Sequence, residues 1–600
     1  MSTTNTKQYE NGLFCVMIIP IIIFYQYIFN HSINVPYLDD FQILNTIVRV
    51  QYEPHNWWKI LTENFNGHRF GEIKLLLWLD YLIEGQVNFK TLCIVGSFFL
   101  LGFWYFCLRI MRENYIHIFY FIPFTFILFQ PIFHRNIFWM LSCLQYQQSI
   151  FFTIAAYYFL AKFSTKSFII SVILGIVHTQ INGNAFYVFM LGALIPLYQE
   201  RYKLTTIYCV IGLIIGGLFY LNMPTVVGLA GYSFQDLLIT EPKIILGALS
   251  GFLGGSVEQF TSKHSIIAAF GFSLAIIIGL FMSTFIFLIF KHLVYKTVSK
   301  NDKNEDILLK YHNLFRQRII MVLMAVSLLL TAMGVAISRG IFFKELMLVD
   351  RYLLYSVVSI GVVYLLFIMF TEGKIRQAIG IIALPLSLIF CLHSYYKAIP
   401  QVLYYERSHE ADIYDLKHHR TTNNKMFGFS LQSLALFDES LRRKIYQFPA
   451  SRFDTLENIL SQPVDNQSSK NINLKFSCFN KVEDVYGGVK IIYFNNQDFY
   501  LSEEGCENTF FVVLKNEQTG EAFLIYPQRP SPLRKDFLRS YQLFSSGFTT
   551  MIQQDCVKKG TYRVGLLVFE NKKANLRYTQ QYVRIDNTKM IDWMQSFGYY

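Results

Sequence analysis

The sequence predicts an α-helical protein that crosses a membrane many times and ends in a small β-sandwich. Hydrophobic residues make up 53% of its 600 positions and charged residues only 16%, with a mean hydropathy of +0.33. Ordinary water-soluble chains carry more charge than this. The apolar residues gather in long runs before about residue 397, whereas the chain after residue 473 has the short alternating segments and turns of strands.

We expect about eleven membrane spans, because apolar runs of nearly sufficient length recur that often. The first runs from Gly12 to about Phe29 and has no cleavage signal after it, so we expect it to remain as a span. The others cover about residues 90–110, 116–133, 140–161, 167–181, 184–198, 204–222, 264–290, 319–338, 351–370 and 376–396. A polar turn at 178–184 separates two short runs and is expected to dip into the membrane.

The positions of the basic residues orient these spans. When spans alternate, one side receives the loops that carry Arg109, Lys162, Arg201, Lys374 and the basic 291–318 segment. The positive-inside rule makes this side cytoplasmic. The other side then holds the loops 30–88, 134–139, 223–263 and 339–350 and all residues after about 397. The net charge of +12 is thereby explained by topology, and we expect a lipid bilayer and no nucleic acid as partner.

The chain divides by composition into four segments. Residues 1–397 form the transmembrane domain, with a first outer loop at 30–88 in which 41–50 and 73–83 have the apolar spacing of interfacial helices. Residues 398–462 are expected to be a helical juxtamembrane segment, 463–472 a linker, and 473–600 the β-sandwich. Strands are expected at 474–479, 489–494, 509–514, 522–526, 562–569 and 576–585.

The nine cysteines show no zinc-site spacing. Cys478, Cys506 and Cys556 fall in the β-sandwich, and their pairing stays open at this point.

Two adjacent carboxylates, Asp39 and Asp40, follow the first span and are the candidate catalytic groups. Transfer of a sugar to a hydroxyl group requires a base that takes the acceptor proton, and a carboxylate within hydrogen-bond reach can do so. The structural alternative is a solvated turn or a helix N-cap, since a helix-like run begins directly afterwards. A divalent metal held by Asp39 or Asp40 also stays open, although no His, Asp or Glu cluster has metal-site spacing.

Arg339, Arg351 and Tyr352 flank an outer loop between two spans, level with lipid headgroups. If a sugar is transferred from a polyprenyl phosphate, the leaving phosphate requires a cation to stabilise its charge. Arg binds phosphate in bidentate fashion. Arginine anchors at span ends are the alternative. Asp350, next to Arg351, is expected to neutralise part of this charge.

The first outer loop carries further candidates. His68 and Arg69 are expected to contact the donor phosphate or to order the loop through ion pairs. Amide, carboxylate and aromatic side chains suit sugar hydroxyls and sugar faces, but aromatic residues equally form ordinary interface belts. The candidates for substrate binding are Trp57, Trp58, Glu63 and Glu72 in this loop and His134 in the next outer loop.

The motifs Leu38-Asp-Asp-Phe41, Gly67-His-Arg-Phe-Gly71, Ser338-Arg-Gly340 and Asp350-Arg-Tyr-Leu-Leu-Tyr-Ser356, in this order, resemble those of the GT-C superfamily of integral membrane glycosyltransferases. The resemblance is closest to bacterial members and covers about residues 12–396. Members commonly have Glu before the His-Arg pair and Ser before the Arg-Tyr pair, whereas this chain has Gly67 and Asp350.

The resemblance implies an active site on the outer face of the bacterial cytoplasmic (inner) membrane and a polyprenyl-phosphate-linked sugar as donor. The acceptor would be a glycan, lipid or protein. Asp39 or Asp40 would be the base, and Arg339 and Arg351 would bind the donor phosphate. The alternatives are a transporter or flippase for lipid-linked glycans, an O-antigen-type polymerase or ligase, and a membrane anchor for the β-sandwich.

Overall fold

The structure is a computed structural model that describes residues 3–64, 69–221, 242–298, 305–339, 350–420, 431–461, 477–483, 489–497, 499, 508–532, 536, 539, 542–553, 557–570 and 573–585. The chain forms two compact units. The first unit comprises residues 1–30, 49–79 and 91–397, and the second comprises residues 31–48, 80–90 and 398–600. The expected first outer loop, 30–88, is therefore divided between the two units.

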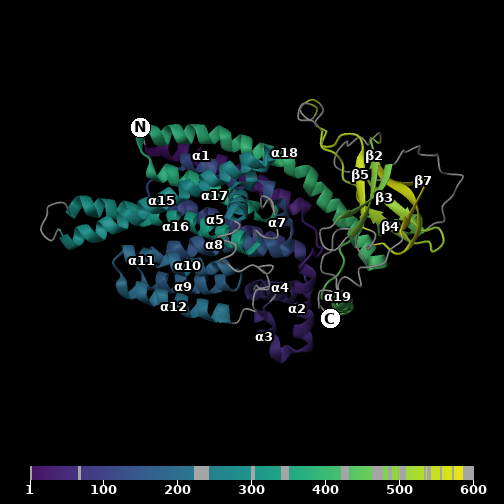
Figure 1. Cartoon of the computed structure of the whole chain (residues 1–600), viewed down its shortest axis with the longest axis horizontal. Coiled ribbons are helices and arrows are strands. Elements are labelled where there is room, and N and C mark those ends of the chain that lie inside the picture. The colour runs from purple at the N-terminus through teal and green to yellow at the C-terminus, as the bar shows by residue number, and fades with distance from the viewer. Residues whose placement is uncertain are drawn as a thin grey trace. The chain divides into compact units, whose positions relative to one another are not determined.

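Helices make up the described part of the first unit (Figure 1). They are α1 (Thr3–His31), α3 (Trp57–Thr62), α5 (Phe89–Glu113), α6 (Ile122–Leu128), α7 (His134–Phe138), α8 (Met140–Leu160), α9 (Thr165–Thr179), α10 (Phe186–Gly192), α11 (Leu194–Tyr198), α12 (Tyr202–Leu221), α14 (Pro242–Gly254), α15 (His264–Val298), α16 (Glu305–Arg339) and α17 (Leu353–Phe370). Of these, α1 has His31 and α5 has Phe89 and Lys90 in the second unit. Three further helices also have residues in both units: α2 (Asp40–Tyr52), α4 (Gly71–Glu84) and α18 (Gly373–His419).

Within the described residues, seven helices are long and apolar enough to cross a membrane. These lie at Glu10–His31, Phe89–Glu113, Ile118–Phe138, His264–Phe290, Arg318–Ser338, Asp350–Phe370 and Gly373–His419. The expected polar break between two short spans is confirmed as a break in the helices, because α9 ends at Thr179 and a 3₁₀ turn, η4 (Gly183–Ala185), precedes α10. The chain is thus a multi-pass membrane protein by the length and composition of its helices.

The helix α14 lies where the sequence predicted only an outer loop, at 223–263. Its run of 13 residues is too short to span a bilayer alone, so the length criterion missed it. Two glycines bring it against α15: a Cβ at Gly271 would lie 1.9 Å from the Ser250 carbonyl oxygen, and one at Gly254 would lie 2.3 Å from the Ile267 carbonyl oxygen. The two backbones are therefore in direct contact, as in other close-packed membrane helices.

The described residues of the C-terminal part of the second unit form two small antiparallel sheets. One has the order β1-β2-β5, with β1 (Ser477–Glu483), β2 (Val489–Asn496) and β5 (Phe548–Gln553). The other has the order β4-β3-β6-β7, with β3 (Thr509–Lys515), β4 (Ala522–Ile525), β6 (Gly560–Glu570) and β7 (Lys573–Ile585). Six of the strands occupy segments predicted from the sequence, with shifted ends, and β5 was not predicted. The first predicted strand overlaps β1, and its residues 474–476 lie outside the described residues.

Alternate residues of β3 face two different hydrophobic cores. Phe510, Val512 and Leu514 pack with Phe494 and Phe548 of the other sheet. Phe511 and Val513 face the opposite way and pack with Ala411 and Tyr414 of α18 and with Phe453. Because both faces are covered, every residue of β3 is buried.

The segment expected to be helical, 398–462, contains helices in the second unit. The helix α18 does not end near residue 396, where the last span was expected to stop, but continues to His419. It is followed by α19 (Leu431–Arg442) and α20 (Glu457–Ser461). The expected linker at 463–472 lies outside the described residues.

The contact between α14 and α15 makes Gly271 sensitive to substitution. We expect Gly271→Ala to lower the stability of the detergent-solubilised protein by about 1–3 kcal/mol, because the added methyl group meets backbone atoms that cannot rotate away. Thermal unfolding is the measurement. Gly279→Ala, on the same helix but with no heavy atom within 4 Å of the added Cβ, is the matched control. Equal stability of the two variants would contradict the packing described.

Candidate functional site

The acidic pair begins the helix α2. Asp39 is the N-cap residue, whose carbonyl oxygen accepts hydrogen bonds from the N–H groups of Gln42 and Ile43, both at 3.1 Å. Asp40 is the first residue of the helix and is only 1% exposed. Its Oδ2 accepts a hydrogen bond from the Tyr37 N–H at 3.1 Å, while its own N–H donates to the Tyr37 carbonyl at 3.0 Å. Asp40 is therefore held by the turn that precedes it, whereas Asp39 is partly exposed.

Leu38, directly before the acidic pair, has a φ of +49°. This left-handed conformation costs an ordinary L-residue roughly 1–2 kcal/mol. Among the described non-glycine residues, four others with positive φ (Tyr115, Glu200, Arg420 and Lys444) follow the ends of helices, where such a conformation is a common cap. Leu38 instead precedes a helix, so its strain positions Asp39 and Asp40.

Aromatic and hydrogen-bonding contacts fix the same loop within the second unit. The ring of Tyr37 lies 5.6 Å from that of Tyr405 and 5.1 Å from that of His409, both on α18. Phe41 packs edge-on against Phe437 of α19, at 5.2 Å between ring centroids. The residues on both sides of the acidic pair are thus held by the C-terminal helices.

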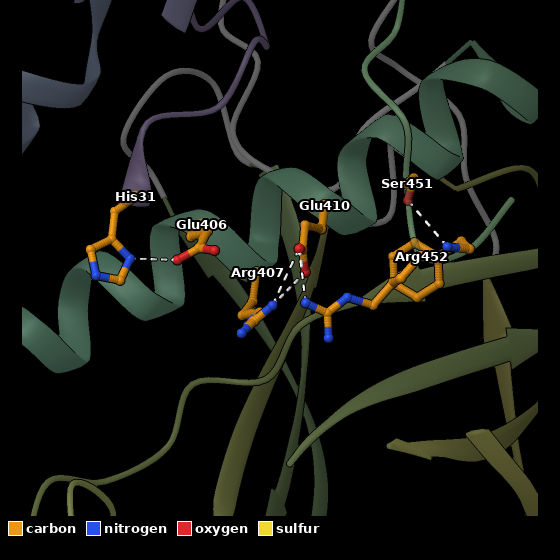
Figure 2. A network of polar contacts seen from close by, with 7 residues as sticks. His31, Glu406, Arg407, Glu410, Ser451 and Arg452 are labelled. Atoms are coloured by element: carbon orange, nitrogen blue, oxygen red, sulfur yellow. Dashed lines mark hydrogen bonds and ion pairs between the residues drawn. The ribbon is translucent and has the colours of Figure 1, made fainter. Parts of the chain in front are cut away.

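Charged side chains extend this support along α18 (Figure 2). His31 Nδ1 lies 2.7 Å from Glu406 Oε2. One turn further along α18, Glu410 accepts hydrogen bonds from Arg407 at 3.1 Å and from Arg452 at 3.0 Å. His31, the first residue of the segment 31–48 that carries the acidic pair, is thereby bonded to α18. The next turn of α18 is bonded to Arg452 of the same unit.

A second motif in the first unit uses the same backbone device. Phe70, in the His-Arg-Phe-Gly motif, also has a φ of +49° and also precedes a helix, α4. Glu72 lies in the first turn of α4, and its Oε1 accepts a hydrogen bond from Gln148 Nε2 at 2.9 Å. Its Oε2 is buried without a hydrogen-bond partner. Burial raises the pKa of Glu72 to about 8, and the bond from Gln148 opposes this rise only in part.

The other candidates of the first outer loop have structural partners. Arg69 donates to the Leu218 carbonyl oxygen at 2.8 Å, and His68 lies outside the described residues. Glu63 forms an ion pair with Arg49 at 2.5 Å, with both side chains nearly half exposed. Lys74, which sequence reasoning did not single out, donates to the Glu63 carbonyl at 2.8 Å and has its pKa lowered to about 8 by burial. These contacts order the loop.

Trp57 and Trp58 form an exposed aromatic group with Trp78. The ring of Trp57 stacks on Trp78 at 5.5 Å and meets Trp58 edge-on at 5.5 Å. Trp57 is 38% exposed and Trp58 is 63% exposed. Such a surface fits an interface belt as well as a sugar face.

The candidate phosphate ligands lie at η7 (Asp350–Tyr352). Asp350 Oδ2 forms an ion pair with Arg135 Nε at 2.8 Å, so the carboxylate is directed to another arginine as well as being adjacent to Arg351. The guanidinium of Arg351 lies over the ring of Tyr352, 5.1 Å from its centroid. His134 is buried beside Asp350. Arg339 is the last residue of α16, and its side chain lies outside the described residues.

The first unit also contains a group of buried polar side chains. The sequence alone pointed only to Glu72 and to the 178–184 turn among them. Ser149 Oγ lies 2.9 Å from His178 Nε2 and donates to Asn184 Oδ1 at 3.1 Å. Asn184 in turn donates to Thr331 of α16 at 3.2 Å. The run of polar residues at 145–149, inside an otherwise apolar helix, was the available signal, because polar groups in a span usually face a functional cavity or a partner helix.

Within the described ranges, no group of three or more His, Cys, Asp or Glu side chains is placed to hold a metal ion. Comparisons of the chain with protein-family models, with curated proteins and with solved structures found no match.

The raised pKa of Glu72 predicts a pH-dependent stability. Between its ordinary value of 4.5 and about 8 the folded protein holds a proton that the unfolded chain releases, so rising pH destabilises the fold. We expect Glu72→Gln to remove this dependence, by up to about tenfold in the folding equilibrium constant per pH unit. Thermal unfolding from pH 5 to 8 is the measurement, with Glu84→Gln, an exposed carboxylate of the same helix, as control. A constant difference between Glu72→Gln and wild type over this range would contradict the burial of Glu72.

Proposed function

We propose that the protein transfers a sugar from a polyprenyl-phosphate donor to an acceptor hydroxyl on the outer face of the bacterial cytoplasmic membrane. The observation that carries the proposal is the acidic pair, held directly after the first span by a left-handed leucine at the start of a helix. Strained backbone at a carboxylate is a common property of functional sites. The acceptor is a glycan, lipid or protein.

The two carboxylates have different roles in this proposal. Asp39, which is partly exposed, is the base: it takes the proton of the acceptor hydroxyl as the oxygen attacks the anomeric carbon. The bond between that carbon and the phosphate oxygen breaks, and polyprenyl phosphate leaves with the electron pair. Asp40, which is buried and accepts a hydrogen bond from the Tyr37 N–H, keeps the loop in place and does not contact the substrate.

The donor phosphate is assigned to Arg351 and Tyr352 of the first unit. A guanidinium stabilises the charge that develops on a leaving phosphate. The ion pair between Asp350 and Arg135 supports this assignment. Because the Asp350 carboxylate pairs with Arg135, it neutralises less of the charge of Arg351. Arg69 is bonded to α12 and is assigned to loop order. Arg339 remains a candidate from the sequence.

The proposed topology has about eleven spans. It combines the seven candidate helices with α8 and with the three shorter apolar helices at Thr165–Thr179, Gly183–Tyr198 and Tyr202–Leu218. With the basic loops in the cytoplasm, the acidic pair and the C-terminal region are extracytoplasmic. The two C-terminal sheets are then interpreted as a β-sandwich outside the membrane.

The roles of the two carboxylates are tested by separate Asn variants. We expect Asp39→Asn to lower the rate of sugar transfer about 10²–10⁴-fold, because it removes the base. Asp40→Asn should have a much smaller effect, since an amide oxygen can still accept the Tyr37 N–H. The assay follows release of undecaprenyl phosphate from sugar-linked donors by membranes containing each variant.

Asp438→Asn, at an exposed carboxylate of the same unit that pairs with Arg420 at 2.8 Å, controls for loss of surface charge. An Asp39→Asn protein that transfers sugar at the wild-type rate would rule out Asp39 as the base. Loss of activity in Asp40→Asn alone would exchange the two roles.

A further inference from the structure

Six residues of the first unit form what we call the buried polar cluster: Glu72, Gln148, Ser149, His178, Asn184 and Tyr355. They come from α4, α8, α9, η4 and α17. Gln148 joins Glu72, and the next residue, Ser149, joins His178 and Asn184. The hydroxyl of Tyr355 lies near Ser149 and Asn184. The segments that carry these residues also touch elsewhere, since a Cβ at Gly71 would lie 3.2 Å from Gln180 Oε1.

Three polar atoms of the cluster are buried without a hydrogen-bond partner: Glu72 Oε2, Gln148 Oε1 and His178 Nδ1. The side chains of Gln148, His178 and Tyr355 are themselves at most 2% exposed. Each such atom costs roughly 1–3 kcal/mol when it is left unpaired. Three such atoms within one connected cluster indicate groups that a ligand completes.

The chemistry of the cluster selects the ligand. None of its six residues is Lys or Arg, so nothing in it compensates the charge of a phosphate. Gln148 Oε1 can only accept a hydrogen bond, while the Tyr355 hydroxyl can donate or accept. The Glu72 carboxyl is neutral below about pH 8 because it is buried, and can then also donate. A set of neutral acceptors and donors matches sugar hydroxyl groups, which can donate and accept.

An aromatic layer connects the cluster to the candidate phosphate ligand. The ring of Tyr355 lies 5.6 Å from that of Tyr146 and stacks on Phe252 at 5.2 Å. Tyr146 also meets Tyr352 at 5.7 Å, and Arg351 lies over the other ring, that of Tyr352. The contacts therefore run from a cation, Arg351, through aromatic rings to neutral polar groups. This order matches a ligand in which a phosphate is followed by a sugar ring and its hydroxyl groups.

We propose that the buried polar cluster binds an uncharged, hydroxyl-bearing group, which is the sugar of the lipid-linked donor. This assignment of the ligand rests on the proposed function, with the phosphate of the same donor at Arg351. Gln148 and Tyr355 contact the sugar hydroxyls, and Ser149 positions His178. The cluster is thus the part of the molecule that distinguishes a sugar-bearing polyprenyl phosphate from the bare lipid.

The test compares two kinds of lipid on the full-length, detergent-solubilised protein. One is undecaprenyl phosphate, and the other is undecaprenyl phosphate linked to glucose, galactose, mannose or N-acetylglucosamine. Native mass spectrometry gives the ratio of their dissociation constants. We expect wild type to prefer one sugar-bearing lipid, and Gln148→Ala to reduce this preference about 3–10-fold without changing the affinity for the bare lipid. Arg351→Ala should weaken both lipids.

Two further variants separate binding from folding. Glu72→Ala removes both carboxyl oxygens, including the unpartnered Oε2, and should reduce the preference in the same way. Gln199→Ala is the matched control: Gln199 is also buried with an unpartnered Oε1, but its Nε2 bonds to the Ala161 carbonyl at the end of α8 and not to the cluster. Its preference should equal that of wild type. Thermal unfolding checks that each variant is folded.

The outcomes separate this inference from the proposed function. An unchanged sugar preference in folded Gln148→Ala and Glu72→Ala overturns the inference, whatever the result for Asp39. If wild type binds none of the lipids, methyl glycosides of the same four sugars are titrated by saturation-transfer NMR. Glycoside binding that depends on Gln148 supports the sugar site and contradicts only its assignment to the donor. If neither the lipids nor the glycosides bind, both the sugar site and its assignment to the donor are overturned.

Discussion

The cost of a polar group in an apolar, water-poor interior governs this structure. In the membrane-spanning unit, backbone groups are satisfied by helices, and a buried side chain such as Gln148 or His178 needs a partner from another helix or from a ligand. The chain meets this cost in most places with local bonds, for example from Lys74 to the Glu63 carbonyl. At the buried polar cluster it does so only in part. The unpartnered atoms of this cluster lie within one connected group, and for this reason we propose it as a site.

Two residues with strained backbone, Leu38 and Phe70, precede the helices whose first turns carry the carboxylates discussed above. Leu38 and Phe70 each adopt a left-handed conformation before a helix, and each is followed within two residues by Asp40 or Glu72 in a first helical turn. The N-terminal end of a helix favours a negative charge, yet burial opposes it at Glu72. The same backbone device thus produces two environments. Asp39 is partly exposed, whereas burial raises the pKa of Glu72 to about 8.

The sequence predicted elements with strong periodicity and missed those that depend on distant partners. The helices α2 and α4 and most strands were found because their apolar residues repeat at regular spacing. The strand β5 has only six residues, in which apolar and polar positions do not alternate regularly, and its place is set by pairing with β2. The helix α14 is too short for the span criterion. Motif order brought Asp39, Asp40 and Arg351 to notice, but the role of Gln148 depends on Glu72, 76 residues earlier.

Mass spectrometry of surface glycans and glycolipids from cells with and without the gene would show whether the protein transfers a sugar. Sugar transfer predicts that one class of glycan loses the mass of a single sugar unit when the gene is absent. It also predicts accumulation of the corresponding sugar-linked polyprenyl phosphate. Glycans of unchanged mass and structure in both strains, with a lipid-linked oligosaccharide trapped in the membrane, would contradict transfer and indicate transport.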